Sequence, residues 1–335
     1  MIESITWHAP VQDARGADDA VPDLSIVIVS WNVREDLLNC LHALFSPLVR
    51  DALSVEVIVV DNASHDGSAE AAAAFPVTLI RNDENLGYGR ANNMGLRIAR
   101  GRHLMVLNPD TIPQHQSLRA LVDFADSQRR VGIVAPRLLN ADGSVQTAAF
   151  NFPTLPMALL DLFPPPTFLP GRLRLRVLNS RLNGRYPDEP ERVHPFKIDH
   201  PLGAAFLLSR EAYEQCGGFD ESIFMYSEEI DLALRYASAG WECWQVPAAS
   251  VIHLGGQSTR QVPDTMFVEL WRSRLQIYHR YYSPPSRLLL RLLLGIAMLR
   301  DIGFARVATL RSHSNMHTAG RMRRAKAVLR LALKR

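Results

Sequence analysis

Apolar runs and amphipathic runs alternate along the first third of this chain. Four short apolar runs, several of them rich in β-branched residues, are typical of buried strands, and they cover residues 24–31, 55–60, 77–80 and 104–107. Between them lie segments with helical apolar spacing, including residues 34–45, which follow Asn32 as a candidate N-cap. The repeated strand–helix order predicts an α/β fold with a mostly parallel sheet flanked by helices.

Polar side chains follow each of these four strands. They are Ser30 and Asn32, Asp61 and Asn62, Asn82 and Asn85, and Asn108 and Asp110. Pro109 cannot donate a backbone hydrogen bond, so the fourth strand ends there and Asp110 lies on a stiff turn. Because the carboxyl ends of parallel strands share one edge of a sheet, the four loops are expected to line one ligand crevice.

The second half of the chain is less regular. It predicts helices at 115–128 and 264–282, strands at 131–135, 202–208, 242–246 and 250–253, and a hairpin turn at 140–143. Residues 163–195 are rich in Pro and Arg and are interpreted as a loop insertion that orders over a substrate. Ser227 is a candidate N-cap for a helix whose first turn carries Glu228, Glu229 and Asp231.

The composition is that of an ordinary globular protein, with 335 residues, 47% apolar and 21% charged. The three cysteines are far apart in sequence, and no basic segment followed by an apolar one opens the chain. A reduced cytoplasmic protein without a signal peptide is therefore expected. Residues 1–22 lack a strong apolar pattern and are expected to form a flexible tail before a main domain at 23–283.

Charge is distributed unevenly. Residues 286–335 hold 12 Lys/Arg and one acidic residue, which leaves 25 basic and 33 acidic residues in the rest of the chain. Within this segment, residues 288–299 are strongly apolar, but Arg291 interrupts them and the run is shorter than the about 20 residues that span a bilayer. Residues 284–335 are therefore expected to be a basic amphipathic helical tail that lies on a membrane surface rather than on nucleic acid.

Five segments together resemble the inverting family 2 glycosyltransferases with the GT-A fold, especially the bacterial rhamnosyltransferase-like branch that builds surface polysaccharides. These segments are Ser-Ile-Val-Ile-Val-Ser-Trp-Asn (25–32), Val-Asp-Asn-Ala-Ser-His-Asp-Gly-Ser (60–68), Asn-Leu-Gly-Tyr-Gly-Arg-Ala-Asn-Asn-Met-Gly (85–95), Leu-Asn-Pro-Asp (107–110) and the stretch from Gly-Gly-Phe-Asp-Glu to Glu-Glu-Ile-Asp (217–231). The resemblance covers roughly residues 24–282.

The resemblance implies a role for each of these loops. The donor nucleotide would be bound by Ser30, Trp31, Asn32, Asp61, Asn85 and Asn108. Asp110, with His253 as a second candidate ligand, would hold a divalent metal, Mg²⁺ or Mn²⁺, on the donor diphosphate. Glu229 would be the catalytic base, with Glu228 and Asp231 as rival candidates. The chain departs from the family at two positions, because Asn108 replaces the first Asp of Asp-x-Asp and Glu229 replaces an Asp.

Simpler structural roles compete with several of these assignments. An aspartate such as Asp61 often caps a turn, and an asparagine such as Asn85 often hydrogen-bonds to its neighbours in the chain. A histidine at a strand end, such as His253, often has a purely structural role. Glu228 and Glu229 would also favour the helix macrodipole, by about 0.3–1 kcal/mol.

The predicted function is that of a metal-dependent hexosyltransferase. It would move a sugar from a nucleoside diphosphate donor to a hydroxyl of a lipid-linked glycan, on the inner face of the plasma membrane. Two alternatives remain open at this stage: a non-catalytic nucleotide-sugar or glycan binder, and a nucleotidyltransferase. The second is disfavoured because residues 30–36 lack a glycine-rich basic loop for a triphosphate.

Overall fold

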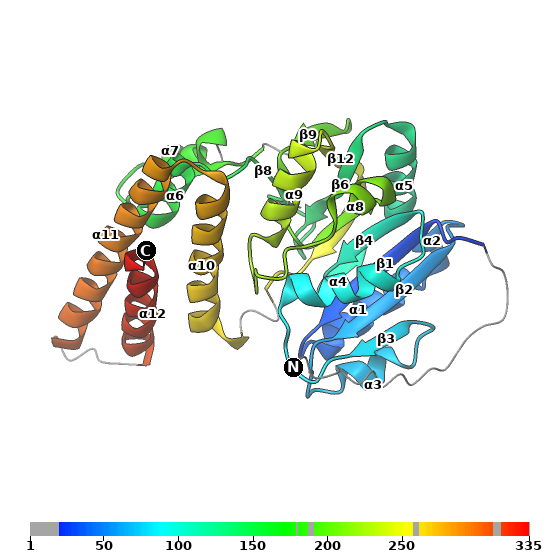
Figure 1. Cartoon of the computed structure of the whole chain (residues 1–335), viewed down its shortest axis with the longest axis horizontal. Coiled ribbons are helices and arrows are strands. Elements are labelled where there is room, and N and C mark those ends of the chain that lie inside the picture. The colour runs from blue at the N-terminus through cyan, green and yellow to red at the C-terminus, as the bar shows by residue number, and fades with distance from the viewer. Residues whose placement is uncertain (1–19, 179, 187–190, 257–260, 311–315, 335) are drawn as a thin grey trace, which may run out of the picture.

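The computed structural model describes residues 20–178, 180–186, 191–256, 261–310 and 316–334. An α/β unit with a central sheet occupies one side of the molecule, and a group of helices from the C-terminal part occupies the other (Figure 1). Most of the N-terminal segment expected to be a flexible tail, residues 1–19, lies outside the described residues.

The first four sheet strands form the parallel half that the sequence predicts. They are β1 (Leu24–Ser30), β2 (Val55–Asp61), β3 (Thr78–Arg81) and β4 (His103–Leu107), in the spatial order β3-β2-β1-β4. β1 pairs with both β2 and β4, and every pairing in this half is parallel. The prediction of parallel strands with helical crossovers is therefore confirmed for this region.

The other half of the sheet is mixed. Its strands are β11 (Ala205–Ser209), β6 (Val131–Leu139), β12 (Glu242–His253) and β5 (Thr111–Pro113), in that order after β4. β11 runs antiparallel to both β4 and β6, whereas β12 runs parallel to β6. Between β6 and β11 the chain adds only two short strands to the sheet, residues 145–146 beside β6 and residues 196–198 beside β12, and no single helical crossover links β6 to β11 to force a parallel direction.

Helices cover both faces of the sheet. One core packs α1 (Arg34–Leu44), α3 (Ser68–Ala72) and α5 (Ser117–Ser127) on one face, with α2 (Pro47–Arg50) at its margin. A second core packs α4 (Tyr88–Ile98), α8 (Arg210–Cys216) and α9 (Glu228–Ser238) on the other. Within β1, Ile26 and Ile28 join the first core and Val27 joins the second, as the two-residue period of a strand requires.

A third core joins the C-terminal helices to an earlier segment. It contains buried side chains from α6 (Leu155–Leu162), α10 (Pro263–Tyr281), α11 (Pro284–Leu310) and α12 (Met316–Leu333). The basic tail expected from the sequence is therefore helical and is packed through one face against the rest of the chain. No helix in the described part of the chain has the length and apolar character needed to cross a membrane.

Short elements complete the chain. They are β7 (Val145–Gln146), β8 (Ala149–Phe150), α7 (Gly171–Leu178), the 3₁₀ turn η1 (Arg181–Asn183), β9 (Phe196–Ile198) and β10 (His200–Pro201). β6 and β7 form the hairpin predicted at residues 140–143. Residues 163–195 are not a loop throughout, because α7 and η1 lie within them, and the strands expected at 242–246 and 250–253 are one strand with an irregular register after Val246.

Of the two predicted N-caps, Asn32 is wrong, and Ser227 is correct in position but makes no capping hydrogen bond. Asn32 does not cap α1, because it adopts a left-handed conformation (φ 53°) and its side chain accepts a hydrogen bond from His65 instead. Ser227 occupies the N-cap position of α9, but its φ is 69° and its hydroxyl makes no capping hydrogen bond. Both residues lie in loops whose tertiary contacts decide the backbone conformation.

Candidate active site

The loops after β1, β2 and β3 are tied together at one edge of the sheet. Ser30 pairs with Asp61, and Asp61 pairs with Arg81, across the parallel strands. The Asn62 backbone N–H donates to the Ser30 carbonyl at 2.8 Å, and the Asn82 N–H donates to the Asp61 carbonyl at 2.9 Å. The structure therefore brings these three predicted loops together.

Three asparagine side chains connect the same loops. Asn82 Nδ2 donates to Asn62 Oδ1 at 3.0 Å, and Asn62 Nδ2 donates to Asn85 Oδ1 at 2.8 Å. Asn85 Oδ1 also accepts the Gly87 N–H at 3.0 Å. The Asn85 carbonyl oxygen is thus engaged within its own loop region, which matches the local hydrogen-bonding role considered from the sequence.

Two buried polar atoms at this edge have no hydrogen-bond partner among the described residues. One is Ser30 Oγ and the other is Asp61 Oδ1, although Asp61 Oδ2 accepts the Ser64 N–H at 3.1 Å. Buried polar atoms are rarely left unpaired, so these two are candidates to bind a ligand. Trp31 and Asn32 lie half-buried beside them, and the Asn32 N–H is occupied by Ser64 Oγ at 3.0 Å.

The turn after β4 lies against the end of β12. Asp110 and His253 are both buried, and Asp110 Oδ1 lies 3.5 Å from His253 Nε2. His253 Nδ1 is 2.7 Å from Gln146 Oε1, and the Gln146 amide donates to Asn140 Oδ1 at 3.0 Å. The Gln146 oxygen must therefore accept a hydrogen bond from the Nδ1–H of His253, which leaves the Nε2 lone pair directed toward Asp110.

Asp110 and His253 form a pair of oxygen and nitrogen ligands. Burial lowers the pKa of His253, an effect that the Asp110 carboxylate opposes, so the imidazole is neutral at pH 7. No group of three or more His, Cys, Asp or Glu side chains suited to a metal occurs among the described residues. A metal here would need substrate oxygens or water to complete its coordination, as Mg²⁺ commonly does.

The start of α4 packs against the loop before α9. Gly87 has φ 83°, and a Cβ on it would lie 2.4 Å from the Phe224 carbonyl oxygen, so only glycine fits there. The Tyr88 N–H donates to that same carbonyl at 2.9 Å. This contact holds the loop that leads into Glu228 and Glu229 against the start of α4.

Glu228 and Glu229 begin α9 in buried surroundings. Burial and the neighbouring Glu229 raise the pKa of Glu228 well above its ordinary value, and one of its oxygens has no hydrogen-bond partner among the described residues. Burial raises the pKa of Glu229 to about 7. A hydrogen bond from its own backbone N–H and the nearby Arg274 guanidinium partly oppose this rise in pKa.

Tyr88 connects the two acidic halves of the site. Burial and the carboxylates of Glu228, Glu229 and Asp110 raise the pKa of Tyr88. Its hydroxyl donates to the Gly203 carbonyl at 2.5 Å, and a Cβ on Gly203 would lie 3.6 Å from Glu229 Oε2. The next residue, Ala204, accepts the Asn108 N–H at 2.8 Å. Residues 203–204 therefore lie close both to Glu229 and to the turn that carries Asp110.

Asp231 has a different environment from the two glutamates. It is fully buried, and its carboxylate accepts hydrogen bonds from Arg235 Nε (2.8 Å), Arg280 Nη1 (2.6 Å) and the Tyr281 hydroxyl (2.7 Å). Arg280 also pairs with Asp220. These contacts join α9 to α10 and occupy both oxygens of Asp231.

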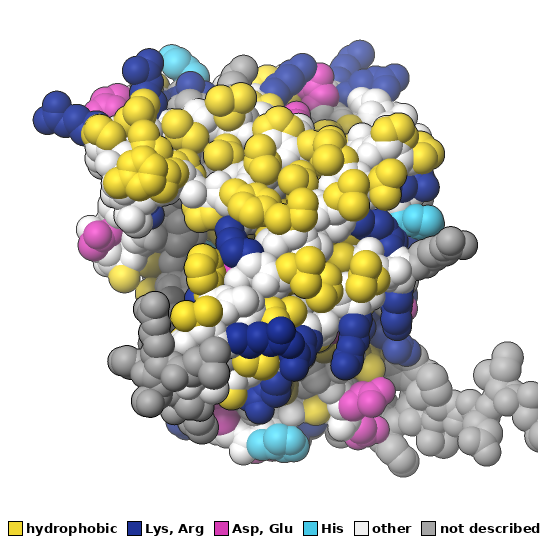
Figure 2. All heavy atoms as spheres, turned by 90° about the vertical axis from the view of Figure 1, so that its left-hand side faces the viewer, with side chains coloured by type: hydrophobic (Ala, Val, Ile, Leu, Met, Phe, Trp, Pro, Cys, Tyr) yellow, Lys and Arg dark blue, Asp and Glu magenta, His cyan; other side chains and the backbone are white. Residues whose placement is uncertain are grey.

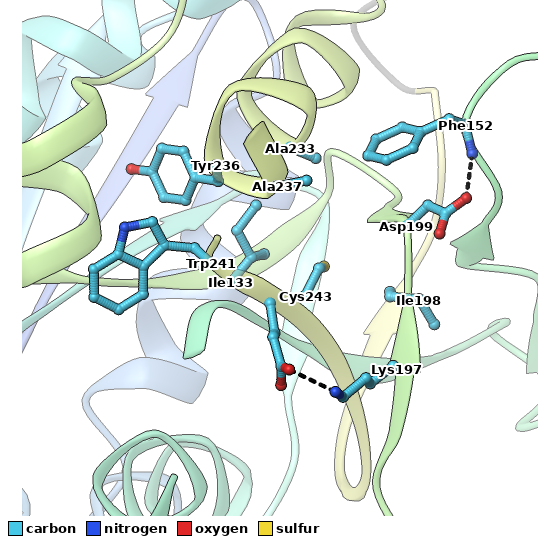
Figure 3. Close-up of a pocket in the computed structure, with 11 residues that line it drawn as sticks. Ile133, Phe152, Lys197, Ile198, Asp199, Ala233, Tyr236, Ala237, Trp241 and Cys243 are labelled. Carbon is cyan, nitrogen blue, oxygen red and sulfur yellow. Dashed lines mark hydrogen bonds and ion pairs between the residues drawn. The ribbon is translucent and has the colours of Figure 1, made fainter. Parts of the chain in front are cut away.

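A separate cavity of about 190 Å³ lies near the other end of α9 (Figure 3). Tyr236, Trp241 and Cys243 line it, and Lys197 is paired with Glu242 at its margin at 2.5 Å. None of the site residues predicted from the sequence lines this cavity.

Three residues of the site were not singled out from the sequence, although Tyr88 lies within the 85–95 segment that resembles the family. Tyr88, Gln146 and Gly203 are single residues whose positions depend on contacts with segments more than 100 residues away. Only the small residues near the start of β11 hint at a close approach of other groups.

Comparison with known proteins agrees with this geometry. A profile for glycosyl transferase family 2 matches residues 25–217. The N-acetylglucosaminyl-diphospho-decaprenol L-rhamnosyltransferase of Mycobacterium tuberculosis is 33% identical over 62% of this chain and 69% of its own length. The succinoglycan biosynthesis protein ExoO of Rhizobium meliloti is 37% identical over 71% of this chain and 62% of its own length. The solved mannosyltransferase of Pyrobaculum calidifontis, 17% identical, superposes with a TM-score of 0.53 over 94% of this chain and 87% of its own.

The mixed sheet with helices on both faces has the GT-A fold of solved glycosyltransferases. The chain belongs to glycosyl transferase family 2, and its relatives include rhamnosyltransferases and proteins of polysaccharide biosynthesis. Enzymatic sugar transfer is thereby favoured over the two alternatives left open from the sequence, a nucleotidyltransferase and a non-catalytic binder.

Proposed function

We propose that this chain is a metal-dependent inverting glycosyltransferase that moves a hexose, such as rhamnose, from a nucleoside diphosphate to a hydroxyl of a lipid-linked glycan. The observation that carries the proposal is the common surroundings of Asp110 and Glu229. Both carboxylates act on Tyr88, and residues 203–204 contact Glu229 on one side and the turn of Asp110 on the other. Two acidic groups with separate tasks are what displacement of a diphosphate by a hydroxyl requires.

The donor nucleotide is proposed to lie along the loops after β1 and β2. Ser30 Oγ and Asp61 Oδ1 are buried there without partners and can hydrogen-bond a nucleobase. Trp31, Asn32 and Asn108 border the same edge, whereas Asn85 is proposed to act by holding the loop around Asn62 in shape. This division of roles follows from which side-chain atoms are already engaged.

Asp110 and His253 fit a divalent metal bound on the donor diphosphate. A carboxylate oxygen of Asp110 and a neutral imidazole nitrogen of His253 lie 3.5 Å apart, close enough to bind one ion together. When bound, such an ion neutralises the negative charge that develops on the leaving diphosphate. The Pyrobaculum mannosyltransferase was solved with GDP-Man and Mn²⁺, which supports Mn²⁺ or Mg²⁺ as the ion here.

Glu229 is proposed to be the general base. Its pKa of about 7 is close to the pH at which the enzyme would work, which is where a base is most effective. Attack on the face of the sugar opposite the diphosphate inverts the anomeric centre. Glu228 is more deeply buried than Glu229, and both oxygens of Asp231 already accept hydrogen bonds from arginines. We therefore propose that Glu228 influences the pKa of Glu229 and that Asp231 holds Glu229 in position.

The proposal is tested by donor turnover with and without metal. Purified full-length chain is incubated with a panel of nucleoside diphosphate sugars and Mn²⁺ or Mg²⁺, and release of the nucleoside diphosphate is measured. At least one donor is expected to turn over, and excess EDTA or the change Asp110→Asn is expected to lower the rate at least tenfold. Turnover that is unaffected by both would contradict a metal-dependent mechanism, and no turnover with any donor would contradict the proposed activity.

Gln146 offers a test of the His253 assignment. Because Gln146 fixes the imidazole tautomer, Gln146→Ala is expected to raise the Mn²⁺ concentration needed for half-maximal activity by about 10–100-fold. The measurement is activity as a function of Mn²⁺ concentration. The control is Asn140→Ala, which lies one hydrogen bond further from His253 and is expected to raise the required Mn²⁺ concentration less. Equal requirements in wild type and Gln146→Ala would argue that His253 does not bind the ion.

An apolar surface supports membrane docking of the C-terminal helices. The side of the molecule formed by α6, α7 and α11 carries gathered hydrophobic side chains with Lys and Arg around them (Figure 2). On α11 the exposed apolar residues are Leu288, Leu289, Leu292, Ile296, Leu299, Phe304 and Val307, and on the 155–182 segment they are Leu159, Phe168, Leu173, Leu175 and Leu182. We propose that this surface, the apolar face, lies on an anionic membrane as a peripheral contact at the cytoplasmic side.

Vesicle flotation tests the apolar face. Replacing Leu288, Leu292 and Leu299 together by Gln is expected to lower the fraction of protein that floats with phosphatidylglycerol vesicles by roughly tenfold. Leu48→Gln with Ile98→Gln changes exposed apolar residues elsewhere and is expected to leave flotation unchanged. Flotation that is equal in both variants would rule out docking through this face.

A further inference from the structure

A second cavity opens directly beside Glu229. It has a volume of about 200 Å³ and lies among α6, α9, α10 and α11. Glu229 lines it together with Met157, Trp271, Tyr278 and Leu290, so both the early 155–162 segment and the C-terminal helices contribute to its wall. An apolar cavity of about 150 Å³ holds a benzene ring, so this volume accommodates one six-membered sugar ring.

The lining of this cavity includes a buried tyrosine hydroxyl that a ligand could hydrogen-bond. The Tyr278 side chain is 3% exposed, and its hydroxyl has no hydrogen-bond partner among the described residues. Burial raises the pKa of Tyr278, and the opposing effects of Arg274 and Asp161 on it show that the hydroxyl lies near that ion pair. A buried hydroxyl without a partner is destabilising unless a ligand or water satisfies it.

Arg274 completes the polar part of the lining. Its Nη1 lies 2.7 Å from Asp161 Oδ2, and its guanidinium lies 5.0 Å from the centre of the Trp271 ring. The pair is nearly neutral as a whole but still presents several N–H donors. An aromatic wall, hydrogen-bond donors and acceptors, and little net charge match a carbohydrate better than a phosphate or an apolar molecule.

We propose that this cavity binds the acceptor sugar, carried on a lipid diphosphate, with its reactive hydroxyl at Glu229. The inference rests on the proposed function, because it assigns the second substrate of that same site. The acceptor oxygen forms a bond to the anomeric carbon of the donor while its proton passes to Glu229. The bond from that carbon to the diphosphate oxygen breaks, and its electron pair leaves with the diphosphate.

The position of Leu290 explains why a lipid carrier fits. Leu290 lines the cavity, whereas Leu288, Leu289 and Leu292 on the same helix are exposed on the apolar face. One helix, α11, therefore separates the sugar-binding cavity from the surface proposed to touch the bilayer. The carrier chain can stay in the membrane while the sugar reaches Glu229.

Binding measurements with a defined probe test this assignment. The probe is N-acetylglucosaminyl diphosphate carrying a farnesyl chain, and farnesyl diphosphate without the sugar is the control ligand. Tyr278→Phe removes only the unpaired hydroxyl, so the fold is expected to be retained. The Kd of the sugar-bearing probe is expected to rise about three- to tenfold in Tyr278→Phe and more in Arg274→Gln, with no change for farnesyl diphosphate.

Two further variants make the result specific. Tyr213→Phe alters a tyrosine of α8 packed against the second core and is expected to leave every Kd unchanged. Glu229→Gln is expected to bind the probe but not to transfer sugar to it. A wild-type chain that does not bind the probe, or equal Kd values in wild type, Tyr278→Phe and Arg274→Gln, would overturn the cavity assignment. Wild-type binding without transfer from any donor would instead overturn the proposed function.

Discussion

Replacing Glu229 by Gln is expected to lower kcat for sugar transfer by about 10²–10⁴, the usual contribution of a general base. Gln keeps the size and hydrogen-bonding capacity of the side chain but cannot take the proton of the acceptor hydroxyl. The same change at Glu228 is expected to cost less, because Glu228 is more deeply buried than Glu229. The measurement is kcat with donor and acceptor at saturation, and a larger loss in Glu228→Gln than in Glu229→Gln would transfer the role of base to Glu228.

The pH profile gives an independent readout of the same residue. With a Glu229 pKa of about 7, wild-type kcat/KM is expected to rise about tenfold per pH unit below 7 and to level off above it. In Glu229→Gln, kcat/KM is expected no longer to rise with pH in this range. Because burial raises the folded-state pKa above the ordinary 4.5, folding stability from this group is highest at low pH and falls as the pH rises from about 4.5 to 7. The Gln variant is therefore expected to unfold no more easily than wild type at pH 8, so lost activity cannot be assigned to lost folding.

Asp231→Asn is expected to lower the free energy of unfolding by about 2–3 kcal/mol. The change leaves Arg235 and Arg280 without their shared buried carboxylate at the contact between α9 and α10. The effect stays below that of a completely buried pair, because the Arg280 side chain is 43% exposed and can be solvated by water. Denaturant unfolding monitored by circular dichroism measures it.

The matched control is Asp123→Asn, which removes an exposed i,i+4 pair with Arg119 and is expected to change stability by less than about 0.5 kcal/mol. Asp231→Asn is also expected to lower kcat, because the same contacts hold Glu229 and the Trp271–Tyr278 wall of the cavity in register. If Asp231→Asn were as stable as Asp123→Asn and yet inactive, Asp231 would have a direct role in the chemistry rather than a positioning one.

Much of the fold was predictable, because the parallel half of the sheet is encoded by local patterns. β-branched apolar runs form β1 and β2, an apolar run forms β4, and the proline after β4 ends that strand and places Asp110 at the carboxyl edge. The direction of β11 was not predictable, since an isolated apolar run carries no information about which neighbours it pairs with. The candidate cap at Asn32 was wrong for a related reason, because Asn32 adopts a left-handed conformation and its side chain accepts a hydrogen bond from His65 in the loop after β2.

The sequence predicted only some features of the basic C-terminal tail. Its apolar run correctly predicts a helix, and the exposed leucines of α11 remain consistent with a membrane surface. The sequence did not reveal that the opposite side of α11, including Leu290 and Leu294, belongs to a core shared with α6 and α10. A helix with apolar residues on most of its circumference can face protein on one side and lipid on the other. Its packing neighbours decide which of its residues are buried in the core and which remain exposed.

The sequence by itself determined the kinds of elements, the loops that carry polar groups and the membership of the chain in its family, because these depend on residues close together along the chain. Only the tertiary structure decided that Asp110 and Glu229 share one environment, that Gln146 orients His253, and that Tyr278 is buried without a partner beside the base. Such relations join residues up to about 120 positions apart, and their geometry depends on how whole elements pack.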